Sequence, residues 1–162
     1  MNAARRLCLA LPALLLAPAA TRAHGFRVGD IEIDHPYALP TADGQAQGAV
    51  YLRRLRNHGG RADRLLAAET PRARAVAFHR GPLDDPQAMS LHAEPGIALP
   101  AGAELRLRHG GEWHLLLQGL QQPLREGERF PLKLRFEHAG EREVVVWVQR
   151  PRSTGTGHLH RH

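Results

Sequence analysis

Apolar and polar residues alternate with a period of two in several short stretches of this 162-residue chain. The clearest stretches are AELRLR and KLRFE, and REVVVWV near the end belongs to the same group. Such alternation puts apolar side chains on one face of the backbone and is typical of half-buried β-strands. Turn-forming sequences such as NHGG, PGIALPAGA and HAGE separate the stretches. The pattern therefore predicts short strands joined by turns.

No stretch carries a sustained 3.6-residue apolar repeat, and LQGLQQPLREGE has room for one short helical turn before Pro123. Strands with turn signals at this spacing are typical of sandwiches and barrels. We therefore expect an all-β fold, a single immunoglobulin/cupredoxin-like β-sandwich over residues 24–150. Residues 151–162 are rich in Gly, Ser and Thr, and we expect a flexible tail there.

The first 23 residues have the composition of a secretory signal peptide. A basic start, MNAARR, precedes the apolar run LCLALPALLLAPAA, and TRA offers a cleavage site after Ala23. The run is broken by Pro12 and Pro18, and it is shorter than the about 20 residues that span a membrane. We therefore expect cleavage of residues 1–23, export to the periplasm, and no stable membrane insertion afterwards.

Charge and cysteine content exclude several classes of function. The formal charge is +6, but loss of three arginines with residues 1–23 leaves 19 basic and 16 acidic residues, or +3. These residues are scattered rather than clustered with aromatics, so we expect no nucleic-acid partner. Cys8 is the only cysteine and precedes the apolar run, whereas a lipoprotein cysteine would follow it. The mature chain thus has no thiolate nucleophile, and it can form neither a disulfide within the chain nor a blue-copper centre.

Two histidines and one methionine form the candidate metal site. His79 and His114 lie in β-patterned segments, and Met89 lies between them in the chain. Imidazole and thioether are side chains that hold copper where no thiolate is present. Because residues i and i+2 share a strand face, His114 should lie beside Leu116. We expect His79, Met89 and His114 at one end of the sandwich, in a shallow site that permits ligand exchange.

Other histidines are weaker candidates. Cleavage after Ala23 would make His24 the new N-terminus, whose amine and imidazole together can chelate Cu(II). Additional imidazoles are available from His92, close to Met89 in the chain, and from His158, His160 and His162 in the tail. Each has a plainer interpretation: termini are commonly poorly ordered, the end resembles part of a purification tag, and a lone methionine is often core filler. We expect no role for His35, His58, His109 and His138, which the pattern places near turns.

The order of the segments resembles the periplasmic copper chaperone PCu(A)C family. The resemblance covers residues 28–149, from GDIEIDHPYA onward, and GGEWHLLLQGLQQPLREGE is its most specific part. The family motif has a histidine, a methionine about ten residues later, and then histidine-x-methionine. His79 and His114 match the two histidines, whereas Leu91 and Leu116 occupy the methionine positions, with Met89 close to the first.

The resemblance implies a copper carrier rather than an enzyme, binding Cu(I), Cu(II) or both. It implies a copper-recipient protein as partner, such as cytochrome oxidase or its assembly factor. Because thioethers favour Cu(I) while imidazole also suits Cu(II), the loss of sulfur predicts weaker Cu(I) binding and relatively better Cu(II) binding. Two alternatives remain. One is an exported β-sandwich binding module whose metal site has degenerated, and the other is an oxidase that uses His24.

Overall fold

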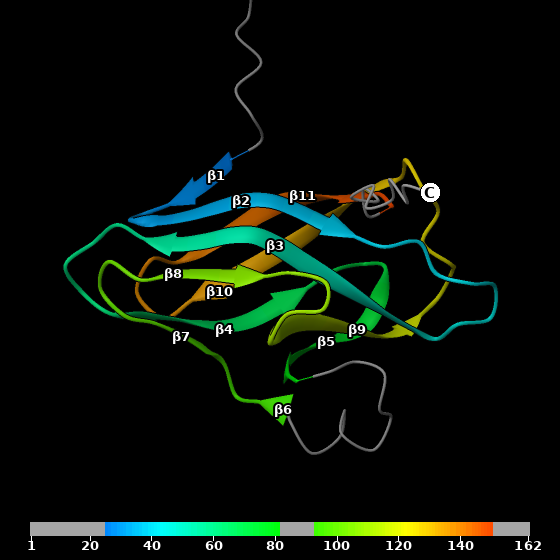
Figure 1. The fold of residues 1–162 in the computed structure, drawn as a ribbon, viewed down its shortest axis with the longest axis horizontal. Helices are drawn as coiled ribbons and strands as arrows, with labels where there is room; N and C mark the ends of the chain where they lie inside the picture. Colours follow the sequence, from blue (N-terminus) through cyan, green and yellow to red (C-terminus); the bar gives the residue numbers. More distant parts are fainter. Residues whose placement is uncertain (1–24, 82–92, 151–162) are drawn as a thin grey trace, which may run out of the picture.

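The computed structural model describes residues 25–81 and 93–150, and Figure 1 shows them as strands joined by turns and loops. The expected all-β fold is confirmed, and the described residues form no helix. The strands are β1 (Gly25–Val28), β2 (Ile31–Ala38), β3 (Gln47–Asn57), β4 (Asp63–Glu69), β5 (Ala73–Arg80), β6 (Ala93–Glu94), β7 (Ile97–Leu99), β8 (Glu104–Leu107), β9 (Trp113–Leu120), β10 (Arg129–Phe136) and β11 (Glu141–Val148).

One hydrogen-bonded sheet runs through these strands in the order β6-β5-β9-β3-β2-β11-β10-β4-β7. Neighbours are antiparallel except β2 and β11, which are parallel. The 11-residue strand β3 pairs with β9 through its first half and with β8 through its second. It therefore joins two parts of the sheet. In Figure 1, β2, β3 and β8 pass in front of β10 and β11, so the sheet folds over itself as a sandwich.

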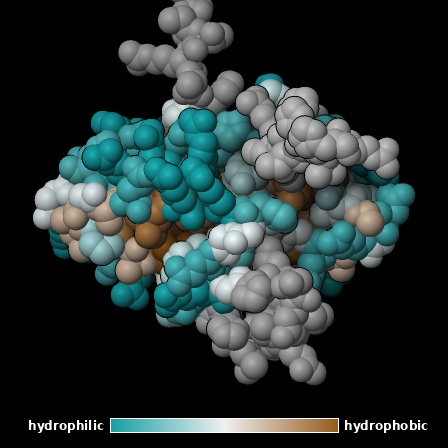
Figure 2. Space-filling view, in the orientation of Figure 1, coloured by the Kyte–Doolittle hydropathy of each residue, from teal (hydrophilic) through white to brown (hydrophobic). Residues whose placement is uncertain are grey.

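The core lies between these layers and follows the alternation in the sequence. On β10 the inward residues are Leu132, Leu134 and Phe136, and on β11 Val144, Val146 and Val148 take the same role. Burying one such side chain contributes roughly 1.5–3 kcal/mol. The face in Figure 2 is covered mainly by hydrophilic residues, with hydrophobic residues visible in the gaps between them. Period-two patterning therefore determines which side of each strand faces the core.

Two local expectations are wrong, and one stretch with room for a helical turn does not form it. PGIALPAGA is not simply a turn, because Ile97–Leu99 forms β7 and pairs with β4. The stretch LQGLQQPLREGE forms the end of β9 and then turns without a helix. His35 lies within β2 rather than near a turn. Among the described residues other than glycine, it alone has a positive φ, of 47°. No helix in the described part of the chain is long and apolar enough to cross a membrane.

Candidate metal centre

His79 and His114 are brought together by the antiparallel pair β5 and β9. They are directly opposite in the register, and their ring centroids lie 6.1 Å apart with an interplanar angle of 34°. In Figure 1 the two strands run side by side, and the pair sits where β5 ends and β9 begins. The expected meeting of these histidines at one end of the sandwich agrees with this arrangement.

The pair lies on the face of the sheet that points away from the main core. Leu115 and Leu117 of β9 belong to the core cluster, whereas His114 and Leu116 alternate with them and point the other way. The expected shared face of His114 and Leu116 is thus present. Yet His79 and His114 are each only 1% exposed. The expectation of a shallow site is therefore wrong for the two rings, which are fully enclosed.

A second, smaller buried layer surrounds the histidines. Ala49, Tyr51 and Leu116 are buried, but they are not part of the main core cluster. In the register, Leu116 lies between Ala49 on β3 and Ala77 on β5. Small residues on both neighbouring strands leave room around Leu116. The two imidazoles are therefore embedded in largely apolar surroundings.

Burial determines the protonation state of His114. Desolvation, with smaller contributions from His79 and His109, lowers the pKa of His114 from 6.5 to about 4. The imidazole is therefore neutral at pH 7, and one ring nitrogen carries a free lone pair. Its Nδ1 is buried and makes no hydrogen bond with any described residue. An unsatisfied buried nitrogen costs about 1–3 kcal/mol, and a metal ion would satisfy it.

Tyr51 packs against His114, and the sequence analysis did not identify it. Its ring meets His114 edge-on at 5.8 Å and 85°, and it meets His109 in the same way at 5.7 Å and 82°. Its other neighbour is Tyr37, at 5.1 Å, whose hydroxyl accepts a hydrogen bond of 3.3 Å from the backbone N–H of His109. Burial, and then proximity to Tyr37, raise the pKa of Tyr51 to about 12. The phenol is therefore neutral and packs as a rigid wall.

The structure describes two of the predicted ligands. Met89 and the neighbouring positions Leu91 and His92 lie outside the described residues, as do His24 and the tail histidines His158, His160 and His162. Within residues 25–81 and 93–150, no group of three or more His, Cys, Asp or Glu side chains could hold a metal ion. The described donor set is thus a pair of imidazoles, which suits copper or another metal that accepts nitrogen ligands.

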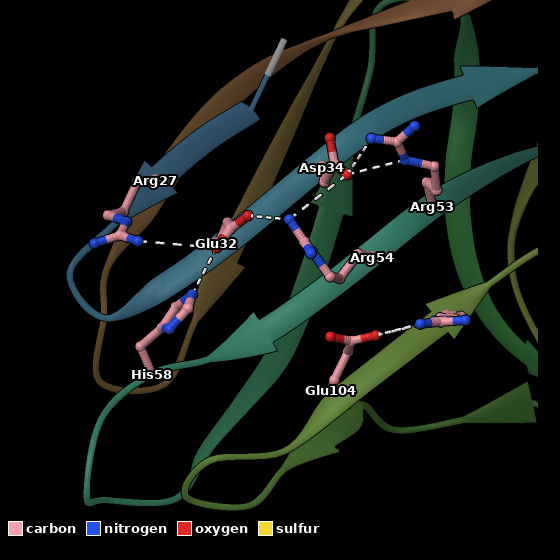
Figure 3. A network of polar contacts seen from close by, with 8 residues as sticks. Arg27, Glu32, Asp34, Arg53, Arg54, His58 and Glu104 are labelled. Carbon is pink, nitrogen blue, oxygen red and sulfur yellow. Dashed lines mark hydrogen bonds and ion pairs between the residues drawn. The ribbon is translucent and has the colours of Figure 1, made fainter. Parts of the chain in front are cut away.

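A second polar cluster, on β2 and β3, serves the fold rather than a ligand (Figure 3). Asp34 accepts two hydrogen bonds from Arg53, of 2.9 and 2.7 Å, and Glu32 is 2.6 Å from both Arg54 and His58. The hydrogen bond with His58, followed by Arg54, lowers the pKa of Glu32 even though burial opposes it. Both carboxylates are already engaged by cations, so neither is available to a metal ion.

Comparison with known proteins places this arrangement in a family. Residues 31–148 match the LpqE-like family, which is described as comprising proposed lipoproteins. The chain belongs to the LpqE-like family. One curated relative of this LpqE-like protein is a proposed lipoprotein of Leifsonia xyli subsp. xyli, Lxx21020. It is 24% identical over 132 residues, which cover 82% of this chain and 77% of the relative.

Solved structures confirm the resemblance to the PCuAC fold. A copper-bound PCuAC domain from PmoF2 is 27% identical with a TM-score of 0.68, and covers 79% of this chain and 99% of that domain. An apo PCuAC domain from PmoF1 is 26% identical with a TM-score of 0.66, and covers 79% of this chain and 100% of that domain. The Cu(I) form of DR1885 from Deinococcus radiodurans, at 23% identity and a TM-score of 0.60, covers 83% of this chain and 88% of its own, and supports the fold alone.

Proposed function

We propose that the protein is an exported copper carrier that binds the metal at His79 and His114 and passes it to a recipient protein. One observation carries the proposal: two buried imidazoles face each other on a PCuAC fold, and His114 is neutral with an unsatisfied Nδ1. The similarity to the copper-bound PCuAC domain from PmoF2 supports copper as the cargo. Membership in a family of proposed lipoproteins supports export. The signal peptide predicted for residues 1–23 favours the periplasm as the destination.

The donor set suits transfer rather than permanent retention. Two imidazoles leave copper short of a full coordination shell, so a partner's ligand can bind before the metal leaves. Leu116 fills space beside His114 but donates no electrons, which makes the site richer in nitrogen and poorer in sulfur. Such a site tolerates Cu(II) as well as Cu(I). Met89 would be the third ligand, and His92, His24 or the tail histidines would act only in its place.

The protein acts by binding and release, so we propose no catalytic role. Because both rings are 1% exposed, copper reaches them only when the residues that cover them move apart. Docking of a recipient can drive such a movement if it stabilises the open form. The recipient we propose is a copper-dependent oxidase or a protein that assembles one, such as cytochrome oxidase or its assembly factor.

Copper titration of the mature protein, residues 24–162, tests the proposal. Competition with a coloured Cu(I) chelator, and separately with a Cu(II) chelator, should give one copper per chain. The His79→Ala/His114→Ala double variant should lose that site, while His138→Ala, at an exposed turn, should not. Undiminished binding in the double variant would overturn the assignment. Absence of copper binding in the parent protein would favour a binding module whose metal site has degenerated.

A further inference from the structure

A surface pocket lies between β1, β2, β10 and β11, apart from the proposed copper ligands. Its cavity measures about 240 Å³, and its lining consists of Phe26, His35, Pro36, Arg129, Val145 and Trp147. Val145 and Trp147 are 48% and 36% exposed, and they are the exposed large hydrophobic residues of the described chain. Exposed apolar side chains grouped around a concavity commonly mark an interaction site.

One arginine, Arg129, lines the aromatic part of the pocket without a carboxylate partner among the described residues, and Arg142 lies outside the lining. The guanidinium of Arg129 lies 4.8 Å from the Trp147 ring centroid, and that of Arg142 lies 6.0 Å from the Phe26 ring. Neither Arg129 nor Arg142 forms an ion pair with any described residue. The positive charge of Arg129 is therefore open to an anion that enters the pocket.

The pocket shares a face of the sheet with the histidine pair. Trp147 is opposite Tyr37, and Tyr37 is opposite Tyr51, whose ring contacts His114. Three steps between neighbouring strands separate β11 from β9, which amounts to about 15 Å at 4.8 Å a step. A protein segment bound at Trp147 would thus lie on the same face of the domain as His114, about 15 Å away.

We propose that this pocket docks a partner-protein segment in which an aromatic or aliphatic side chain stands next to a carboxylate. The apolar side chain enters between Trp147, Val145 and Phe26, and the carboxylate pairs with Arg129. A concave pocket whose lining holds one unpaired cation matches one apolar side chain and one acidic group. An anionic membrane would instead call for a broad basic surface.

Peptide titration of the metal-free protein tests the proposal. The protein is expressed from the full 162-residue sequence and purified in the form that the cells accumulate. The probe is acetyl-Glu-Asp-Phe-Leu-amide, and the readout is the amide and indole NMR spectrum of the ¹⁵N-labelled protein. Saturable shifts should appear at the Trp147 indole and the Phe26 and Val145 amides, with a dissociation constant on the order of 1 mM. The chemical shift of the Trp113 indole should not change. Because the pocket holds none of the proposed copper ligands, the outcome is independent of copper binding.

Matched peptides and variants separate this interpretation from its rivals. Acetyl-Lys-Lys-Phe-Leu-amide and acetyl-Glu-Asp-Ser-Ser-amide should bind much more weakly. Arg129→Glu should weaken binding of the acidic peptide about threefold to fivefold, whereas Arg135→Glu on the same strand should have no effect.

Two outcomes would overturn the proposal. One is the absence of chemical-shift changes at 5 mM peptide, on the order of five dissociation constants, and the other is equal binding of the lysine peptide. Trp147 shifts caused only by anionic phosphatidylglycerol vesicles, or by protein concentration alone, would also overturn it in favour of a membrane or a second copy.

Discussion

His79 and His114 stand directly opposite each other on β5 and β9, with ring centroids 6.1 Å apart. Opposite positions on antiparallel strands are the nearest cross-strand neighbours in a sheet. The two proposed ligands are therefore positioned by strand pairing, on rigid elements, before any loop contributes. A carrier built this way can keep half of its site constant while other donors change during transfer.

Acid should destabilise the metal-free protein through His114. In the folded state its pKa is about 4, against 6.5 for the free side chain. Between these values the unfolded chain binds the additional proton, so the stabilising contribution present above pH 6.5 is lost as the pH falls toward 4. We expect a loss of about 2 to 3 kcal/mol between pH 7 and pH 4.5 from this group. Urea unfolding at the two pH values, with a chelator present, measures it.

The His114→Gln variant provides the control for this pH dependence. Glutamine does not titrate, so the variant should show a pH difference smaller by most of that amount. A His138→Gln variant, changed at an exposed turn, should behave as the parent does. An identical pH dependence in parent and His114→Gln would show that His114 titrates normally in the folded protein.

The sequence predicts the faces of the strands but not how the strands pair. AELRLR, KLRFE and REVVVWV alternate as the structure does, because a period of two depends on the local sequence alone. That His79 lies opposite His114 depends on the register between β5 and β9, whose partners are 35 residues apart in the chain. Register is determined by long-range packing, so local pattern does not encode it.

Tyr51 escaped prediction although the sequence carries a signal for it. Residues 49–52 read Ala-Val-Tyr-Leu, and all four are buried. A continuous apolar run of this kind indicates a strand that is covered on both faces. The same signal recurs at LLL, residues 115–117, beside His114. Two such runs predict a second buried layer outside the main core, which is where the histidine pair lies.

The phenol of Tyr51 should titrate far above an ordinary tyrosine. Burial raises its pKa to about 12, against 10 for the free side chain. Because Tyr37 and Tyr51 are the chain's two tyrosines, a Tyr37→Phe variant isolates the Tyr51 signal. Tyrosinate absorbance near 295 nm should then rise with a midpoint near pH 12, or with unfolding if that comes first. A midpoint near 10 while circular dichroism still reports the native fold would contradict the enclosure of this ring.

Asp63 should be a strong stabilising residue far from the metal site. Its carboxylate accepts hydrogen bonds from the backbone N–H groups of Arg64, His138 and Ala139, at 2.7, 3.0 and 2.9 Å. Burial alone would raise its pKa, but these three bonds lower it below 3.8. Asp63→Ala leaves buried amides unsatisfied and should cost about 2 to 3 kcal/mol of unfolding free energy. Asp63→Asn should cost less, and copper affinity should not change in either variant.

Leu116→Met should convert the site toward Cu(I). Leu116 is 4% exposed, shares its face with His114, and lies between two alanines in the register. Methionine has nearly the same volume, so the exchange should cost less than about 1.5 kcal/mol of stability. Its thioether is a soft ligand beside His114, so Cu(I) affinity should rise on the order of tenfold to a hundredfold, with little change for Cu(II).

Leu115→Met is the matched control, because Leu115 is fully buried in the main core on the opposite face. The Cu(I) affinity of this variant should equal that of the parent protein. Competition with a Cu(I) chelator gives both affinities, and an equal gain in the two variants would mean that the added sulfur acts somewhere other than beside His114.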